Sequence, residues 1–338
     1  MQRTTILRRT LLAAVLAAGA PLASAQAVKL TLAHGNPPDN PRHVAAVKFA
    51  ETVKAKTQGR IEIQVAHSAQ LGDDAAMVTG LRSGTLDFSA NSQGAVAAVV
   101  PEYAALGMPF LFADVQKAWS VMDGPIGKEL ADKSAAKGMV LLGLWDNGVR
   151  QMSNSKRPIK APADMKGLKM RTPPDAVTVD IMHAMGADAQ QIKFSELYVA
   201  LQQGVVDGQE NPLTNIVSAK LYEVQKYISL TGHKYESTPF LMSKRTWDRM
   251  APADRQAVTE AAAEATQLQR QLNKEIDDRL VAELKAKGVQ VDAVDRAAFV
   301  EATKPVYTKW LASPIGAFVG RVQQARRGGV AQARQHAL

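Results

Sequence analysis

The arginine at position 171 stands where its side chain could recognise an anion. It ends a short apolar stretch, GLKMR, and is followed by Thr172, Pro173 and Pro174. Pro173 fixes its own backbone φ and restricts Thr172, so little conformational entropy is left to lose when a ligand binds. A guanidinium presents a planar fork of donors that matches the two oxygens of a carboxylate. Arg171 is therefore a candidate carboxylate-binding residue; the alternative is an ordinary exposed arginine at a strand end.

Polar and aromatic side chains also stand at other predicted strand ends. Trp145 ends one apolar segment, Arg150 belongs to the next, and Asn91 and Ser92 directly follow a third. In an open α/β sheet, ligands bind beyond the carboxyl ends of the strands. We therefore expect Trp145 to cover a ligand and Asn91 and Ser92 to hydrogen-bond its far end. For Asn91 and Ser92, simple turn chemistry after a strand explains the residue types equally well.

The segment VVDGQENP, residues 205–212, is dense in amides, carboxylates and turn-forming residues. Its composition is typical either of a loop with a satisfied backbone or of a polar wall, and favours neither. Glu210 adds a carboxylate to this segment, and a surface glutamate is its ordinary explanation. The polar members of the segment are Asp207, Gln209, Glu210 and Asn211.

The enzyme motifs in the chain are incomplete. ANSQG, residues 90–94, follows a strand like the nucleophile elbow of an α/β hydrolase, which would make Ser92 a nucleophile and His183 or His233 its base. Alanine replaces the first glycine of that motif, and neither histidine has a recognisable acid/base context. GPIGK, residues 124–128, is too short for a phosphate-binding loop. With no cysteine, disulfides and thiolate chemistry are excluded, and we expect a protein that is not an enzyme and has no cofactor and no metal.

The chain alternates between strand and helix patterns. Its first part predicts a βαβαβ unit, which folds as a parallel sheet with right-handed connections and helices on its faces. A second unit follows, and both units present polar or aromatic residues where a cleft would form. The predicted strands span 28–34, 61–66, 86–90, 139–145, 149–154 and 169–171, and the predicted helices 43–57, 74–83, 176–185 and 195–203.

The longest helical pattern runs over residues 252–287. Pro252 suits a first turn, Gly288 is a natural stop, and apolar residues recur between them at spacings of three, four and seven. A helix of about 35 residues would be about 50 Å long, which is more than the width of one small domain. We expect it to cross both units; a coiled-coil partner helix is the alternative.

Composition separates the protein from several classes. With 338 residues, of which 46% are apolar and 22% charged, the chain is typical of a soluble globular protein with two cores. A net charge of +9 could suit a nucleic-acid-binding protein. Only 5% of the residues are aromatic, however, and no basic stripe is present, so we expect no nucleic-acid partner.

The first 25 residues predict a secretory signal. Arg3, Arg8 and Arg9 precede an apolar run over 11–22, and the small residues Ala-Ser-Ala end at Ala25, where we expect cleavage. Loss of these three arginines lowers the net charge from +9 to +6. The Arg8-Arg9 pair does not separate Sec from Tat export. We expect an exported, soluble, periplasmic protein.

Six segments of the chain resemble the DctP-type solute receptors of TRAP transporters. The resemblance extends from about residue 30 to residue 303. It implies a monomeric periplasmic receptor with a two-lobed α/β fold that closes on an organic acid and delivers it to membrane permease subunits, driven by an ion gradient. The segments are QLGDD, GTLDF, GVRQMSNSKRPI, ADMKGLKMRTP, FSELYVALQQGVVDGQENP and LYEVQKY.

The resemblance also implies lobes and roles. One lobe would consist of residues 26–147 plus 237–276 and the other of 148–236 plus 277–338, with helix 252–287 crossing both. By position, Arg171 would form a two-pronged salt bridge with the ligand carboxylate, and Arg150 and Asn211 would assist it. Phe194 would line the cleft, although a buried core phenylalanine is nearly as well supported.

Three positions depart from the sialic-acid receptors of this family. Pro174, Gly35 and Ser92 do not reproduce the polar contacts that the resemblance would imply for sialic acid. We therefore expect a sugar acid such as a hexuronate or aldonate, with a C4-dicarboxylate next. A ligand-binding component of a sensory system is an alternative that this sequence alone does not separate from a transport receptor.

Overall fold

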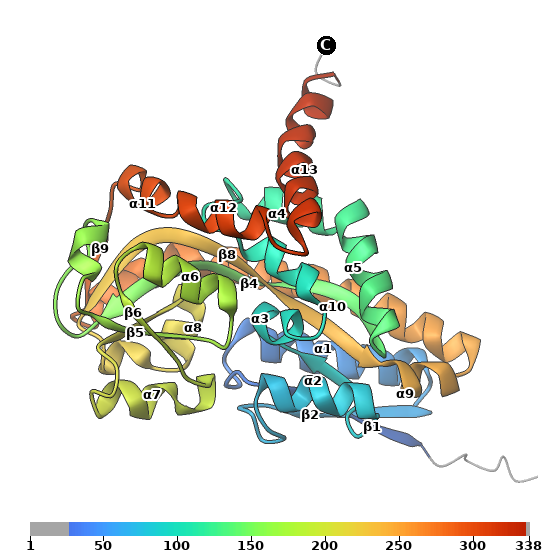
Figure 1. Cartoon of the computed structure of the whole chain (residues 1–338). Helices are drawn as coiled ribbons and strands as arrows, with labels where there is room; N and C mark the ends of the chain where they lie inside the picture. The colour runs from blue at the N-terminus through green and yellow to red at the C-terminus, as the bar shows by residue number, and fades with distance from the viewer. Residues whose placement is uncertain (1–26, 336–338) are drawn as a thin grey trace, which may run out of the picture.

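The centre of the molecule is one continuous mixed sheet (Figure 1). The computed structural model describes residues 27–335, and within them nine strands form a sheet in the order β2-β1-β3-β8-β4-β7-β5-β6, with β9 paired to β8. The strands are β1 (Val28–His34), β2 (Ile61–Ala66), β3 (Phe88–Ala90), β4 (Met139–Asn154), β5 (Lys169–Thr172), β6 (Asp188–Gln191), β7 (Gly208–Asn211), β8 (Tyr227–Ser243) and β9 (Gln290–Ala293).

Helices connect these strands and pack around the sheet. Most of the α-helices are α1 (Pro41–Lys56), α2 (Asp74–Ser83), α3 (Gln93–Ala97), α4 (Val115–Met122), α5 (Pro125–Ala136), α6 (Ala176–Ala184), α7 (Phe194–Gln202), α8 (Leu213–Ser218) and α9 (Lys244–Arg249). The C-terminal part adds α10 (Pro252–Ala286), α11 (Ala297–Ala302), α12 (Lys304–Leu311) and α13 (Gly316–Gln335). Short 3₁₀ helices are η1 (Pro101–Gly107), η2 (Pro162–Met165) and η3 (Leu221–Glu223).

The first lobe confirms the predicted βαβαβ unit. β1 pairs in parallel with both β2 and β3, and α1 and α2 form the connections. Each helix begins at a capping side chain: Asn40 accepts a hydrogen bond from the backbone N–H of Arg42, and Asp73 accepts one from that of Ala76. The carboxyl ends of the three strands therefore meet at one edge of the sheet, beside the start of α1 and α2.

Two long antiparallel strands, β4 and β8, run through the middle of the sheet and join the two lobes. The sequence prediction of two separate strands, 139–145 and 149–154, is wrong, because β4 continues through the residues between them. The register against β8 shifts between Asp146 and Gly148, and Gly148 has a φ of 118°, which glycine adopts far more readily than other residues. In the sequence, the residues of this bulge resemble a turn, and for this reason one strand was predicted as two.

Strand β8 was not predicted at all. Its middle carries His233, Lys234 and Glu236, and all three side chains are fully buried. Polar side chains at buried positions remove the apolar alternation by which a strand is recognised in a sequence. The polar middle of β8 lies between the two lobes, where it contributes to the site described below.

The second lobe is a smaller parallel unit. β5 pairs in parallel with β6 and with β7, and α6 and α7 lie at the predicted places in the chain. β7 also pairs antiparallel with β4 and thereby connects this lobe to the central strands. Arg171 lies on β5, which is paired with β7, the strand that contacts β4 in the middle of the sheet.

Helix α10 confirms the prediction of a long helix across both lobes. Near its start, Val258 and Ala265 pack in the first-lobe core with Phe49 of α1. Near its end, Leu280 and Leu284 pack in the second-lobe core with residues of α7 and α8. Because its apolar stripe is covered from within the chain, a coiled-coil partner is not needed to explain it.

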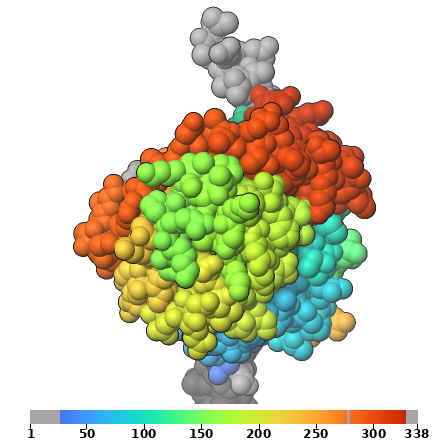
Figure 2. All heavy atoms as spheres, turned by 60° about the vertical axis from the view of Figure 1, so that its left-hand side comes forward, coloured from blue at the N-terminus to red at the C-terminus, as the bar shows by residue number. Residues whose placement is uncertain are grey.

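The two lobes touch each other in this structure. In Figure 2 the second lobe, coloured green to yellow, directly adjoins the cyan segments of the first lobe. Among the helices of residues 27–335, none combines the length and the apolar character needed to cross a membrane. The predicted signal peptide with its cleavage site after Ala25 lies outside the described residues.

Candidate ligand-binding cleft

A cavity of about 320 Å³ lies between the two lobes. This volume falls at the lower end of the range of small-molecule sites in proteins. The first lobe contributes residues from the ends of its strands and the starts of its helices, and the second lobe contributes residues of β4, β5 and β7 and the loops that follow β5 and β6. The polar lining side chains include Asn36, Arg42, Asp74, Ser92, Asn147, Arg150, Arg171, Lys193, Asn211, Asn215 and Glu236.

Arg171 lines this cavity and is only 2% exposed. Its Nε donates to the backbone carbonyl of Ile192 at 2.8 Å, and its guanidinium carbon lies 6.0 Å from the centre of the Phe194 ring. Its two terminal nitrogens have no hydrogen-bond partner among the side chains that the structure describes. Burial lowers the pKa of Arg171 to about 10, because the charge of Glu210 only partly offsets the loss of water.

The backbone after Arg171 is held rigidly, as the two prolines predict. Both Pro173 and Pro174 line the cavity. Asp175 then caps α6 by accepting a hydrogen bond from the backbone N–H of Val177 at 3.0 Å. Strand β5 therefore ends at Thr172, and the chain continues into the N-cap of α6 at Asp175.

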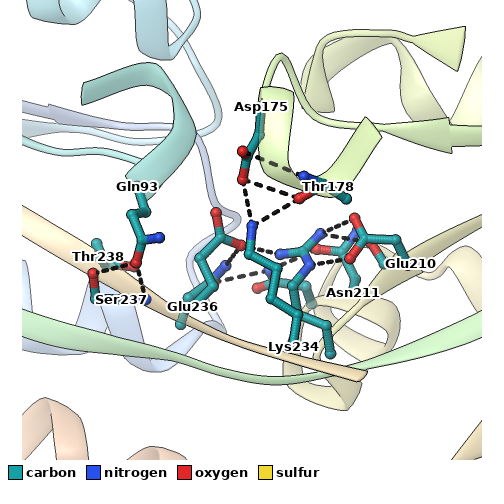
Figure 3. Close-up of polar contacts among 12 residues, drawn as sticks. Gln93, Asp175, Thr178, Glu210, Asn211, Lys234, Glu236, Ser237 and Thr238 are labelled. Atoms are coloured by element: carbon teal, nitrogen blue, oxygen red, sulfur yellow. Dashed lines mark hydrogen bonds and ion pairs between the residues drawn. The ribbon is translucent and has the colours of Figure 1, made fainter. Parts of the chain in front are cut away.

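Arg150 also lines the cavity and is also 2% exposed, but its nitrogens are occupied. It forms ion pairs with Glu210 of β7 and Glu236 of β8, and its Nη2 also donates to the Glu210 carbonyl at 2.6 Å. Burial alone lowers the pKa of Arg150, but the two facing carboxylates outweigh burial and raise it. In Figure 3 the carboxylates of Glu210 and Glu236 lie on opposite sides of a shared group of dashed contacts.

Glu210 is fully buried and nevertheless ionised. Burial raises its pKa, but Arg150 and His233 together reverse the shift and lower the pKa to about 2. The Nε2 of His233 lies 3.3 Å from Oε2 of Glu210. No group of three or more His, Cys, Asp or Glu side chains suited to a metal occurs in the part of the chain that the structure describes.

A second buried ion pair connects Lys234 of β8 with Asp175. Lys234 also donates to Thr178 Oγ1 at 2.7 Å, and Figure 3 shows the three side chains converging between β8 and the start of α6. Attraction to Lys234 outweighs burial and lowers the pKa of Asp175. The pair therefore connects the cap of α6 to the central strand.

Asparagine side chains link the lobes at the back of the cavity. Asn211 accepts a hydrogen bond from Asn215 Nδ2 at 3.1 Å, and its own Nδ2 donates to Gln209. The Oδ1 of Asn215 accepts from Asn36 at 2.9 Å and from Asn40 at 3.0 Å, and both of these belong to the first lobe. The segment around Asn211 is thus a polar wall rather than a loose loop.

At the mouth of the cavity the lobes are held together by further contacts. Lys193 Nζ lies 2.8 Å from Asp73 Oδ2, which belongs to the opposite lobe. Gly94 of α3 lies against Asp175, so closely that a Cβ added at Gly94 would be 2.5 Å from that of Asp175. We describe this arrangement as the closed form.

The remaining predicted site residues divide between the cavity and the core. Ser92 and Phe194 line the cavity. Asn91 lies behind the wall: its side chain is fully buried and donates to Ser89 Oγ. Trp145 requires a correction, because it stacks on Phe240 at 4.5 Å in the first-lobe core and its Nε1 donates to Thr266 of α10. An apolar strand end that points into the core gives the same sequence signal as one that points into a cleft.

Arg42, Asp74 and Glu236 are among the lining residues that the sequence analysis missed. Arg42 and Asp74 stand in the first turns of α1 and α2, the helices that follow the predicted strands 28–34 and 61–66, so extending the strand-end rule to the next helix start could have found them. Glu236 lies within β8, and no pattern in the sequence marked it.

A family model described as bacterial extracellular solute-binding protein, family 7 (DctP), matches residues 32–313. The chain belongs to this family. The C4-dicarboxylate-binding periplasmic protein DctP of Rhodobacter capsulatus is 34% identical over 301 residues, 87% of this chain and 90% of that protein. The protein y4mM of Sinorhizobium fredii is 53% identical over 310 residues, which cover 91% of this chain and 57% of y4mM. This chain thus spans little more than half of y4mM.

Solved structures of the family have the same fold. A TRAP periplasmic solute-binding protein from Polaromonas, bound to D-erythronate, matches with a TM-score of 0.85 at 37% identity, over 88% of this chain and 98% of that one. The DctP family consists of binding proteins rather than enzymes, and the hydrolase alternative for Ser92 is not retained.

Proposed function

We propose that this DctP-family protein is a periplasmic receptor that holds the carboxylate of an organic acid with Arg171. One observation carries the proposal: Arg171 is 2% exposed and lines a cavity between the lobes, and its terminal nitrogens have no hydrogen-bond partner among the side chains that the structure describes. A guanidinium so far removed from bulk water is more stable when hydrogen-bond acceptors and a counter-charge face it. A ligand carboxylate would supply both in a two-pronged geometry.

Other side chains would orient the bound acid. Phe194 packs beside the guanidinium, and Asn211 and Ser92 lie on opposite walls of the cavity. Arg150 would contribute less than the resemblance implies, since its nitrogens already serve Glu210 and Glu236. Its main role would be to hold the cavity floor in shape.

The candidate ligands are a sugar acid, such as an aldonate or hexuronate, and a C4-dicarboxylate. Both classes occur in the family, since the Polaromonas structure contains D-erythronate and the Rhodobacter protein is named for C4-dicarboxylates. After closure the receptor would deliver the acid to TRAP membrane permease subunits. The chain would reach the periplasm through a signal peptide cleaved after Ala25.

Lobe closure would bend the two long strands. The register between β4 and β8 shifts next to Gly148, which lies opposite Glu236. We place the lobe boundaries at this bulge, so that residues 26–147 plus 237–276 and residues 148–236 plus 277–338 move as two bodies. Ligand would favour the closed form because only that form lets both lobes contact it.

A thermal-shift screen tests the proposal. Organic acids should raise the unfolding midpoint, because a ligand that binds only the native state stabilises it. The matched neutral compounds, such as the amide or the aldose of each acid, should have no effect, since they do not offer a carboxylate to Arg171. An equal shift with the neutral analogue would contradict the role of the carboxylate.

A further inference from the structure

Three histidines lie together at the ends of the first-lobe strands. His34 ends β1, His67 directly follows β2, and His43 lies in the first turn of α1. The ring centre of His43 is 5.3 Å from that of His34 and 5.2 Å from that of His67. His34 is fully buried, and the other two side chains are half-buried. These histidines are not among the residues that line the cavity, so binding of the acid does not explain them.

The hydrogen bonds of the cluster fix where its protons lie. The backbone N–H of Asn36 donates to Nδ1 of His34 at 3.2 Å, so this nitrogen carries no proton. A neutral His34 then carries its proton on Nε2, which donates to Nδ1 of His43 at 3.1 Å. Both acceptor nitrogens must be unprotonated, because a proton on either would face another N–H. The chain of bonds therefore exists only while both imidazoles are neutral.

The bond between the two imidazoles closes a loop that reaches the second lobe. It joins the two ends of the segment 34–43, which carries Asn36 and Asn40. Both asparagine side chains donate to Oδ1 of Asn215 in α8, at 2.9 Å and 3.0 Å. Asn36 is thus held at its backbone by an imidazole and bonds to the opposite lobe with its side chain. The shape of this loop couples the histidine pair to the contact between the lobes.

The groups with the strongest influence on the pair oppose its protonation. Burial, together with the charge of Arg42 on α1, lowers the pKa of His34 to about 2. Burial and the neighbouring His67, from the loop after β2, lower the pKa of His43. Asp39, in the same loop, is exposed to solvent, and the α8 side chains that bond to the loop are uncharged. His43 is the half-buried member of the pair and the one that a proton from solvent can reach.

We propose that the His34–His43 pair is an acid-sensitive latch on lobe closure, which holds the loop bonded to Asn215 while both imidazoles are neutral and releases it when His43 is protonated. The proposal rests on the proposed function, in which the lobes close on an organic acid. A protonated His43 would direct a donor at the Nε2 proton of His34, so the rings would separate and the loop would lose its shape. Because the closed form binds this proton less readily than the open form, the latch is complete above about pH 6.5 and weakens as the pH falls.

The test is calorimetric titration of the full chain with D-erythronate and with D-glucuronate, at about pH 7.5 and about pH 5.5. Both acids stay ionised at these pH values, since the pKa of a carboxyl group is about 4. A histidine with a pKa of about 6.5 in the open form and a much lower one in the closed form must lose its proton on closure, which lowers affinity up to about tenfold at the lower pH. Equal affinity at the two pH values would overturn the proposal.

The variant His43→Asn makes the test specific to the latch. Its amide oxygen stands close to the place of Nδ1, so the acceptor is kept but cannot titrate. We expect affinity close to that of the parent at the higher pH and less than about a twofold loss on acidification. The buried His233 and the other histidines are present in both proteins, so the difference between them isolates His43. A His43→Asn variant with the full pH dependence of the parent would overturn the proposal.

Two further variants complete the comparison. His43→Leu removes the acceptor and should bind as weakly at the higher pH as the parent does at the lower one. His183→Asn, at an exposed histidine of α6, is the control and should keep the pH dependence of the parent. Parent-like affinity of His43→Leu at the higher pH would show that the loop does not need the latch, and would also overturn the proposal.

The outcomes separate the latch from the proposed function. If the acids bind the parent with an affinity that does not depend on pH, or if His43→Asn leaves the dependence unchanged, the latch fails and the receptor function stands. If neither acid binds at the higher pH, the receptor function fails for these acids, and the latch, which acts on that binding, fails with it.

Discussion

Arg150 and Arg171 line the same cavity and are equally buried, yet their surroundings give them opposite properties. Each is 2% exposed. Glu210 and Glu236 neutralise Arg150 and raise its pKa, whereas Arg171 has a backbone carbonyl as its partner and its pKa is lowered to about 10. Burial therefore does not identify a ligand-binding arginine. What distinguishes it is the absence of a carboxylate from the protein itself, which applies here to Arg171 within the described residues.

The largest effect should come from removing the ion pairs of Arg150 with Glu210 and Glu236. Arg150→Met would leave Glu210 and Glu236 buried without their cation, and the loss of one partner of a buried pair costs about 3–5 kcal/mol of folding free energy. Urea unfolding of the ligand-free protein measures this. Arg321→Met, at an exposed arginine paired with Glu129, is the control and should change little. Equal stability of the two variants would contradict a structural role for Arg150.

Acid should weaken the same group of ion pairs, because it protonates Glu210. The pKa of Glu210 is lowered from 4.5 to about 2 in the folded protein, so its contribution is complete above about pH 4.5 and is lost as the pH falls toward 2. Linkage gives this contribution as about 3 kcal/mol. Between roughly pH 6 and pH 3, the free energy of unfolding should therefore fall more steeply for the parent than for Glu210→Gln. Parallel pH profiles would show that Glu210 is not the titrating group.

Substitution of Arg171 should change ligand affinity rather than folding stability. Arg171→Lys keeps the charge but removes the planar fork, and we expect acid affinity to fall about 100-fold, or about 2.7 kcal/mol. The ligand-free unfolding midpoint should stay close to that of the parent, because no carboxylate of the protein loses its partner. Calorimetric titration with the best acid from the screen measures the first effect and thermal unfolding the second. Undiminished affinity in the lysine variant would exclude the proposed salt bridge.

The smallest effect should come from an exposed charge at the cleft mouth. Lys193 is 53% exposed and pairs with Asp73 across the lobes. Because solvent screens such a pair, Lys193→Ala should weaken ligand binding only about twofold, and high salt should remove the difference. Lys309→Ala, at an exposed lysine paired with Asp180 away from the cavity lining, is the control. A large, salt-independent loss would mean that Lys193 contacts the ligand directly.

Local patterns predicted much of the fold. The βαβαβ unit, helices 176–185 and 195–203 and the long helix were found from periodicity and capping residues, since these signals depend on neighbours in the chain. The central strands were the exception. Strand β4 was divided at its bulge beside Gly148, and β8 was missed because its buried middle is polar. Buried polar residues are tolerated there only because distant segments supply their partners.

Sequence reasoning located part of the candidate site for the same reason. Arg171, Phe194, Ser92 and Asn211 reach the cavity as expected, whereas Trp145 packs on Phe240 in the core. The strand-end rule gives the position of a residue along the chain but not the side of the sheet on which its side chain lies. That choice depends on the pleat and on what packs against it.

The sequence by itself determined that the chain builds two α/β units and that a stiffly held arginine ends one short strand, because both features depend on residues that are close along the chain. Only the tertiary structure decided which of Arg150 and Arg171 is left without a carboxylate among the described residues. The partners of Arg150 stand 60 and 86 residues away, on β7 and β8. Charge compensation depends on distance in space, and the pairing of the central strands sets that distance.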